Sequence, residues 1–168
     1  MAAMKRERAS RKGAYDIICP LIPGKGKPLV RVTIRSPKRH RKAVYVFAAH
    51  FRREFGYDFV PYGLCGNETD PNHVAFLRVA PEFTDLFFGS TWLVPCVGAC
   101  CFRKWKDWTM QFAWLHPYFR RRQLLTAAWP QFEQEFGRFK LEPPLSPEMK
   151  AAVRKFRPEE GGADGIAT

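Results

Sequence analysis

The segment from residue 108 to residue 136 constrains the fold of this 168-residue chain more than any other segment. An apolar, strand-like run, Trp108 to Leu115, precedes three consecutive arginines, Arg120 to Arg122, and a helix-like run, Leu124 to Phe136, follows them. A helix that begins at such a turn presents unpaired backbone N–H groups and the positive end of its dipole there. Added guanidinium groups favour a phosphate or pyrophosphate ligand. The sequence therefore predicts an anion site between this strand and this helix.

The same segment contains a recognisable motif, Leu115-x-Pro117-x-Phe119-Arg120, followed by a basic turn. Over roughly residues 94–156 it resembles the acyl-CoA-binding motif of the GNAT (GCN5-related N-acetyltransferase) superfamily, in which the turn reads Arg/Gln-x-x-Gly-x-Gly/Ala. Here Arg120 fits the first position, whereas Gln123 and Leu125 replace the two small residues. A Cβ at these positions narrows the approach of a ligand to the backbone, although any non-proline residue still supplies the N–H group.

The resemblance implies an acetyl-CoA-dependent N-acetyltransferase that transfers an acetyl group to an amine of an unknown acceptor. By the same resemblance, backbone N–H groups of the turn bind the pyrophosphate, Leu115 contributes backbone groups to the pantetheine arm, and the arginines add charge. The expected cofactor-binding residues are Leu115, Arg120, Arg121, Arg122, Gln123, Leu124 and Leu125. The alternative is a basic surface turn that binds no phosphate.

Direct acetyl transfer needs a base that deprotonates the amine and an acid that protonates the leaving thiolate. Glu142 is the candidate base, with Asp107 and His116 as alternatives, and the ring of His116 is expected to be exposed beside the motif. Many GNAT members use a tyrosine on the last helix as the acid, but no tyrosine follows Tyr118. Ser146 lies where that acid is expected. Its simpler role is a helix N-cap, in which case a water takes the place of the acid.

The order of predicted elements favours one α/β (α+β) domain of the acyl-CoA N-acyltransferase type, with a mixed, mostly antiparallel sheet flanked by helices. Hydrophobic periodicity and capping residues define these elements. Strands are expected at 29–34, 73–79, 92–103, 108–115 and 138–142, with 15–22 a strand or an extended lead-in and 83–89 ambiguous. Helices are expected at 38–55, capped by Ser36, at 124–136, interrupted by Pro130, and from 147, capped by Ser146. A basic tail (1–14) and an acidic, glycine-rich tail (158–168) are expected to flank the domain (15–157).

The formal charge of +12 is concentrated at one end of the chain. Residues 1–42 contain thirteen Lys and Arg against two Asp and Glu, whereas residues 43–168 contain fifteen against fourteen. This segment is either a surface for nucleic acid or another polyanion, or a solvated basic arm. Two other functions therefore stay open: a basic nucleic-acid-binding protein, and a degenerate acetyltransferase fold that acts as an interaction module.

The five cysteines are an odd number without framework spacing, which indicates reduced thiols. Cys100 and Cys101 are expected on opposite faces of a strand, and no Cys-x-x-Cys occurs, so no metal site is predicted. No apolar run approaches the ~20 residues of a membrane span, and the N-terminus lacks the apolar segment of a signal peptide. A cytoplasmic protein without a membrane partner is therefore predicted.

Overall fold

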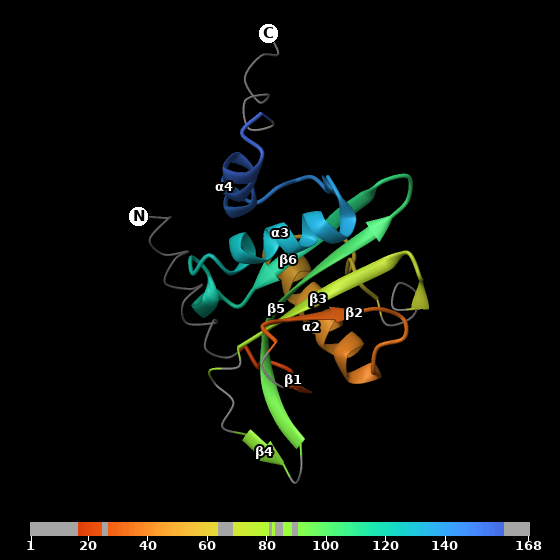
Figure 1. Ribbon diagram of the computed structural model, residues 1–168, viewed down its shortest axis with the longest axis vertical. Helices are drawn as coiled ribbons and strands as arrows, with labels where there is room; N and C mark the ends of the chain where they lie inside the picture. The colour runs from red at the N-terminus through yellow and green to blue at the C-terminus, as the bar shows by residue number, and fades with distance from the viewer. Residues whose placement is uncertain are drawn as a thin grey trace.

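A seven-stranded sheet carries helices on both of its faces (Figure 1). The computed structural model describes residues 17–24, 27–63, 69–80, 82, 86–88 and 91–159. The strands are β1 (Leu21–Pro23), β2 (Leu29–Val32), β3 (His73–Val79), β4 (Leu86–Phe88), β5 (Thr91–Lys104), β6 (Trp108–Leu115) and β7 (Lys140–Leu141). The helices are α2 (Lys38–Phe55), α3 (Leu124–Phe136) and α4 (Pro147–Phe156), and a 3₁₀ turn covers Pro117–Phe119.

The strands follow the order β2-β3-β5-β6-β7, and every neighbouring pair is antiparallel except β6–β7. β5 spans 14 residues, so one strand pairs with β3 and β6 over its C-terminal part and with β1 and β4 over its N-terminal part. That N-terminal part extends below the rest of the sheet in Figure 1. The predicted mixed, mostly antiparallel sheet flanked by helices is confirmed.

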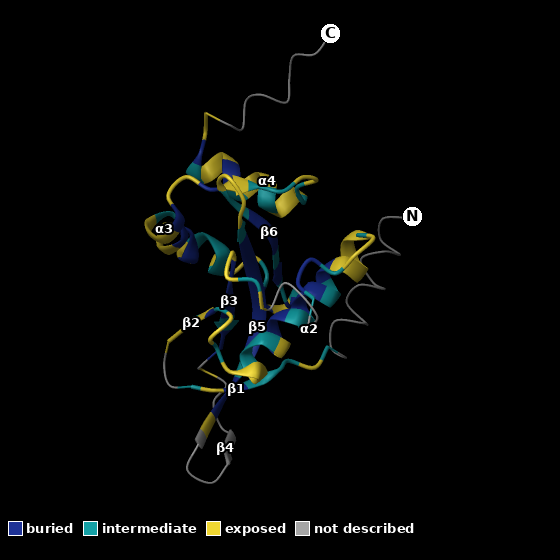
Figure 2. Cartoon of the chain, turned by 90° about the vertical axis from the view of Figure 1, so that its right-hand side faces the viewer, coloured by how far each residue is buried: buried dark blue, intermediate teal, exposed yellow. Residues whose placement is uncertain are grey.

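Each face of the sheet has its own apolar core, because successive side chains of a strand point to opposite faces. Cys101 and Leu77 pack on the α2 side, whereas Cys100 and Phe76 pack on the side of α3 and α4. Figure 2 shows α2 and α3 on opposite sides of the strands. The adjacent cysteines therefore lie on opposite faces, as predicted.

Helix α2 forms because apolar residues recur at helical spacing, and Ala43, Val44, Phe47, Ala48 and Phe51 are buried. Gly56 ends the helix in the left-handed conformation, with φ of 70°. The predicted N-cap at Ser36 is wrong by one residue. The cap is Pro37, and the Ser36 hydroxyl accepts from the backbone N–H of Thr33 at 2.9 Å, so it caps no helical donor.

Helix α3 runs without interruption from Leu124 to Phe136, so the predicted interruption at Pro130 is wrong. Pro130 removes one backbone donor. The buried side chains of Trp129 and Phe132 lie on either side of it and fix the helix against the sheet. Tertiary packing therefore outweighs the missing hydrogen bond.

The predicted elements at 73–79, 108–115, 38–55 and 124–136 have the predicted bounds, whereas β2 and β7 are shorter than expected. Of the predicted segment 15–22, the structure describes residues 17–22, and among these only Leu21 and Ile22 belong to a strand, β1. The predicted tail 1–14 lies outside the described residues, as does 158–168 apart from its first two positions. None of the helices in the described part of the chain combines the length and apolarity needed to cross a membrane.

Candidate functional site

Strands β6 and β7 pair over only two residues and then separate. Thr109 and Met110 face Lys140 and Leu141, and the last backbone hydrogen bond runs from the N–H of Glu142 to the carbonyl of Met110, at 3.0 Å. The next two residues are prolines, which have no N–H and cannot continue a ladder. The sequence therefore opens a gap in the sheet directly after Glu142.

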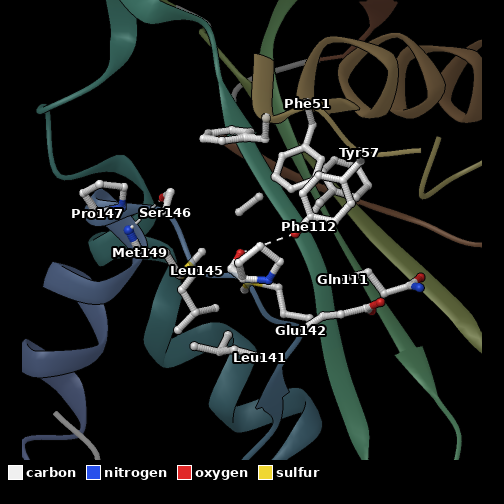
Figure 3. Close-up of a pocket in the computed structure, with 14 residues that line it drawn as sticks. Phe51, Tyr57, Gln111, Phe112, Leu141, Glu142, Leu145, Ser146, Pro147 and Met149 are labelled. Atoms are coloured by element: carbon white, nitrogen blue, oxygen red, sulfur yellow. Dashed lines mark hydrogen bonds between the residues drawn. The ribbon is translucent and has the colours of Figure 1, made fainter. Parts of the chain in front are cut away.

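A cavity of about 220 Å³, here called the aromatic cavity, lies at this gap (Figure 3). Its walls come from the end of α2, from β6 and from the segment that leads into α4. They include the rings of Phe51, Phe55, Tyr57 and Phe112, the thioethers of Met110 and Met149, and the polar side chains of Gln111, Glu142 and Ser146. The ring of Phe51 lies 4.8 Å from Tyr57, 4.9 Å from Phe55 and 5.5 Å from Phe112, so the rings form one cluster.

Two residues that line this cavity, Tyr57 and Glu142, differ in the hydrogen bonds that their side-chain oxygens make. The Tyr57 hydroxyl donates to the Pro144 carbonyl at 3.3 Å (Figure 3). Glu142 Oε2 is buried and has no hydrogen-bond partner in the described part of the chain. Burial, and then the charge of Glu142, raise the pKa of Tyr57 above its usual value. The cavity therefore places a protonated phenol near a carboxylate.

A β-bulge in β6 accompanies this arrangement. Cys101 pairs with Phe112 and Phe102 pairs with Met110, so Gln111 is an extra residue on β6. Beyond the bulge, Phe112 and Trp114 belong to the core on the α2 side. Bulges of this kind bend a strand and redirect its side chains, and they recur beside active sites.

A second cavity of about 370 Å³, here called the arginine-turn cavity, lies between the sheet, α3 and α4. Phe55, Ala113, Ser146 and Met149 line both cavities, so the two adjoin. Its apolar walls end at the first turn of α3, which has neither a side-chain cap nor an acidic residue. That end of the cavity suits an anion, since unpaired amides and a positive helix terminus face it.

The backbone of the arginine turn adopts a conformation that favours glycine. Arg121 and Gln123 have φ of 61° and 56°, in the left-handed region. Gln123 occupies the first position at which the GNAT motif has glycine, and there a side chain costs about 1–2 kcal/mol. The turn therefore keeps the backbone shape that the missing glycine would favour.

The three arginines have different partners. Arg120 donates to both carboxylate oxygens of Glu54 at 2.6 Å and to the Leu115 carbonyl at 2.9 Å. The Arg122 guanidinium lies over the ring of Tyr118, 4.4 Å from its centroid. Arg121 is exposed, lines the arginine-turn cavity and makes no ion pair with the described residues. Of the three, Arg121 is the one that lines this cavity without a carboxylate partner among the described residues.

The predicted cofactor-binding residues are largely brought together. All except Arg122 line the arginine-turn cavity: Leu115, Arg120, Arg121, Gln123, Leu124 and Leu125. The Leu115 carbonyl is occupied by Arg120, and the Arg120 guanidinium by Glu54. Their cofactor-binding role stays a prediction, and the geometry favours the amides and Arg121 over the side chain of Arg120.

Sequence reasoning missed Arg78, and it considered the rings of residues 57–62 as lining of an acceptor cleft or as core, without a catalytic role for Tyr57. Arg78 lines the arginine-turn cavity, and its Nε is buried without a hydrogen-bond partner among the described residues. The signal was available, because alternation in β3 places Arg78 on the same face as Val74 and Phe76, both buried. Tyr57 follows the helix-ending Gly56, and nothing in the sequence pattern indicated that it lies near Glu142.

The two predicted catalytic residues, Glu142 and Ser146, both line the aromatic cavity. Ser146 caps α4 as predicted, since its hydroxyl oxygen accepts from the Met149 N–H at 3.1 Å. Asp107 forms an ion pair with Lys140 at 2.7 Å and lines neither cavity. The expected exposure of His116 is wrong, because the residue is buried and its Nδ1 accepts from the Tyr118 N–H at 3.2 Å.

The cysteines of the described residues are buried or half-buried thiols. Burial raises the pKa of Cys96 to about 12 and also raises the pKa of Cys100 and Cys101. Among the described residues no group of three or more metal-ligating side chains comes together.

Comparison with known proteins identifies the fold. No family model and no curated protein sequence matches this chain. A crystal structure of a probable acetyltransferase matches with a TM-score of 0.51 at 16% identity, covering 77% of this chain and 87% of that one. A ribosomal-protein-alanine N-acetyltransferase from Brucella melitensis biovar Abortus matches with a TM-score of 0.49 at 14% identity, over 83% and 94% of the two chains. An aminoglycoside acetyltransferase from an uncultured soil metagenomic sample matches with a TM-score of 0.46 at 12% identity, over 89% and 93%.

The chain has the fold of a probable acetyltransferase, as the match at a TM-score of 0.51 shows. The fold class implied by the sequence resemblance is therefore confirmed.

Proposed function

We propose that this protein is an acetyl-CoA-dependent N-acetyltransferase that acts on an amine. The observation that carries the proposal is the meeting of two cavities at the gap between β6 and β7, one ending at a helix N-terminus and the other containing a phenol and a carboxylate. Side chains that line both cavities, among them Ala113 and Ser146, mark where a donor and an acceptor would meet.

The residues present fit acetyl-CoA, which supplies an acetyl group on a thioester. The amides of the first turn of α3 and the guanidinium of Arg121 would bind the pyrophosphate, and Arg78 adds a second cationic side chain to the lining of the same cavity. Apolar side chains between this end and the gap would cover the pantetheine arm. The amides can bind phosphate without glycine at position 123, because Gln123 already adopts the left-handed backbone conformation that glycine would favour.

In this proposal Glu142 is the base and Tyr57 is the acid. Glu142 takes a proton from the acceptor ammonium, the C–N bond of the amide forms and the thioester C–S bond breaks. Tyr57 gives its proton to the departing thiolate, and its raised pKa keeps it protonated until that step. The nitrogen loses its second proton as the amide forms, and this proton restores the Tyr57 phenol, while Glu142 releases its own proton to water. The products are the acetylated amine, the CoA thiol and one proton. Ser146, the acid candidate from the sequence, already serves as the cap of α4.

Calorimetric titration with acetyl-CoA tests the proposal, with ADP and desulfo-CoA as controls. We expect saturable binding that needs more than the ADP part. Arg121→Glu should weaken binding, whereas the matched variant Arg122→Glu should change it little, because Arg122 does not line the cavity. Absence of acetyl-CoA binding by the folded wild-type protein would overturn the proposal and favour the degenerate fold that acts as an interaction module.

A second candidate function is favoured by the first turns of α2. Arg35, Lys38, Arg39 and Lys42 are exposed there, and the first turn contains no acidic residue. We also propose that this basic patch contacts nucleic acid. Along α2, Lys38 lies about 25 Å and Lys42 about 20 Å from Phe55, which lines both cavities, so binding there is separable from catalysis.

Fluorescence anisotropy with labelled double-stranded DNA at several salt concentrations tests this second function. Affinity should fall steeply as salt rises, and the Lys38→Glu/Arg39→Glu variant should show a smaller salt slope. The Lys150→Glu/Arg154→Glu variant makes the same charge change on exposed positions of α4 and should bind as the wild type does. Equal effects of the two variants would show that only net charge matters.

A further inference from the structure

The aromatic cavity has one charged side chain among apolar walls. Of the described residues that line it, only Glu142 carries a formal charge at neutral pH. A carboxylate among apolar walls favours a ligand that brings a hydrogen-bond donor and a positive charge. The nearby Tyr57 hydroxyl donates instead to Pro144.

The charge and the walls together select a cation. The rings of Phe51, Phe55, Tyr57 and Phe112 line the same cavity, and the faces of aromatic rings attract ammonium groups. An ammonium group can therefore satisfy Glu142 and contact ring faces at once. A second ammonium on the ligand would meet no carboxylate in this cavity, because the other described lining residues carry none. The walls thus fit one positive charge, not several.

The size of the cavity limits the rest of the ligand. An apolar cavity of about 150 Å³ accommodates a benzene ring. The aromatic cavity measures about 220 Å³, which leaves room for a ring and a short chain. The thioethers of Met110 and Met149 add adaptable apolar surface beside the rings.

We propose that the acceptor is a small primary monoamine with a compact aromatic or apolar body, such as an arylalkylamine. Its ammonium pairs with Glu142 and its apolar body lies among the rings of the aromatic cavity. This inference rests on the proposed acetyl transfer for turnover. Amine binding by itself follows from the cavity alone.

Binding and turnover are measured separately with 2-phenylethylamine as the probe. Calorimetry without acetyl-CoA should show saturable binding, whereas the uncharged 2-phenylethanol and the polycation spermine should bind at least about tenfold more weakly. Glu142→Gln should weaken the binding of 2-phenylethylamine by at least about tenfold and leave the affinity for 2-phenylethanol unchanged. Equal loss for both ligands would mean that the variant disturbs the cavity and would overturn the assignment of the ammonium to Glu142.

A matched pair of variants tests the ring contribution. Phe55→Leu removes a cavity ring that is 38% exposed and should weaken 2-phenylethylamine about two- to fivefold. Phe59→Leu makes the same change at a ring that is 60% exposed and lies outside the cavity lining, and it should have no effect. Equal effects of the two variants would overturn the placement of the amine.

Release of CoA thiol in the presence of both compounds then separates this inference from the proposed function. Acetyl-CoA binding without 2-phenylethylamine binding would overturn the acceptor class and leave the acetyltransferase proposal standing. Binding of 2-phenylethylamine without acetyl-CoA binding would support the amine site and overturn the acetyltransferase proposal. Tighter binding of spermine than of the monoamine would overturn the single-charge argument.

Discussion

Glu54, in the last turn of α2, accepts hydrogen bonds of 2.6 Å from both terminal nitrogens of Arg120, which lies 66 residues further along the chain. The indole N–H of Trp114 donates to the same carboxylate at 2.7 Å, and Arg120 Nε donates to the Leu115 carbonyl. These bonds tie the helix on one face of the sheet to the turn that leads into α3 on the other face. Arg120 therefore positions the turn, and its charge is already paired.

Removal of the Glu54 charge should destabilise the protein. Glu54→Gln replaces a bidentate, charge-assisted pair with a neutral one, and we expect a loss of about 1–2 kcal/mol in the free energy of unfolding by urea. The matched variant Glu135→Gln breaks the pair with Arg31, whose side chain is 51% exposed, and should cost less than about 1 kcal/mol. A larger loss for Glu135→Gln than for Glu54→Gln would contradict the structural role of the Glu54–Arg120 pair.

The same carboxylate should give stability a pH dependence. Burial alone would raise the pKa of Glu54, but hydrogen bonds from Arg120 and Trp114 and the charge of Arg120 outweigh it and lower the pKa. A pKa that is lower in the folded state gives stability that is present above the unfolded value, about 4.3, and is lost as the pH falls through the folded value. Thermal unfolding followed as the pH falls from about 6 through about 4.3 and below should therefore show a smaller acid-induced loss for Glu54→Gln than for the wild type. Parallel curves for the two proteins would rule out this contribution.

Glycine at position 123 should stabilise the arginine turn. Gln123→Gly relieves a left-handed backbone with φ of 56° and should raise the free energy of unfolding by about 1 kcal/mol. Gln123→Ala removes the same polar side chain but keeps the Cβ, so it should give no gain. Equal thermal stability of the Gly and Ala variants would show that backbone strain at Gln123 is unimportant. Acetyl-CoA binding to the Gly variant should be at least as tight as binding to the wild type.

The sequence predicted those features that local physics determines. The apolar spacing from Trp108 to Leu115 and from Leu124 to Phe136 set both elements, and the basic turn between them lines a cavity. The path of α3 through Pro130 was missed because packing against the sheet compensates for a lost hydrogen bond. The places of Tyr57 and Glu54 depend on contacts with residues 60 or more positions away, which no local pattern encodes.

Substitutions at Ser146 distinguish its role as a helix cap from a role in catalysis. Ser146→Ala removes the acceptor for the Met149 N–H and should destabilise the protein by about 1 kcal/mol in thermal or urea unfolding. Ser146→Asn restores a good cap and should recover that stability. Because Tyr57 is the proposed acid, Ser146→Ala should lower the rate of CoA thiol release far less than Tyr57→Phe does. A rate in Ser146→Ala as low as that in Tyr57→Phe would instead assign the acid role to Ser146.

Tyr57 should control both the rate and a titration at high pH. Tyr57→Phe removes the proposed acid and should lower kcat by about 10²-fold or more with little change in amine affinity. Tyr45→Phe, in α2 and outside both cavities, should leave kcat unchanged.

Burial and the charge of Glu142 raise the pKa of Tyr57, so the associated stability is present below the unfolded value of about 10 and is lost as the pH rises through the folded value. Ultraviolet titration should therefore show a late-ionising tyrosine that is missing in Tyr57→Phe. In Glu142→Gln this tyrosine should ionise at lower pH, because the carboxylate charge that opposes tyrosinate is gone. Titration curves of wild type and Glu142→Gln that coincide would refute the electrostatic coupling between the proposed acid and the proposed base.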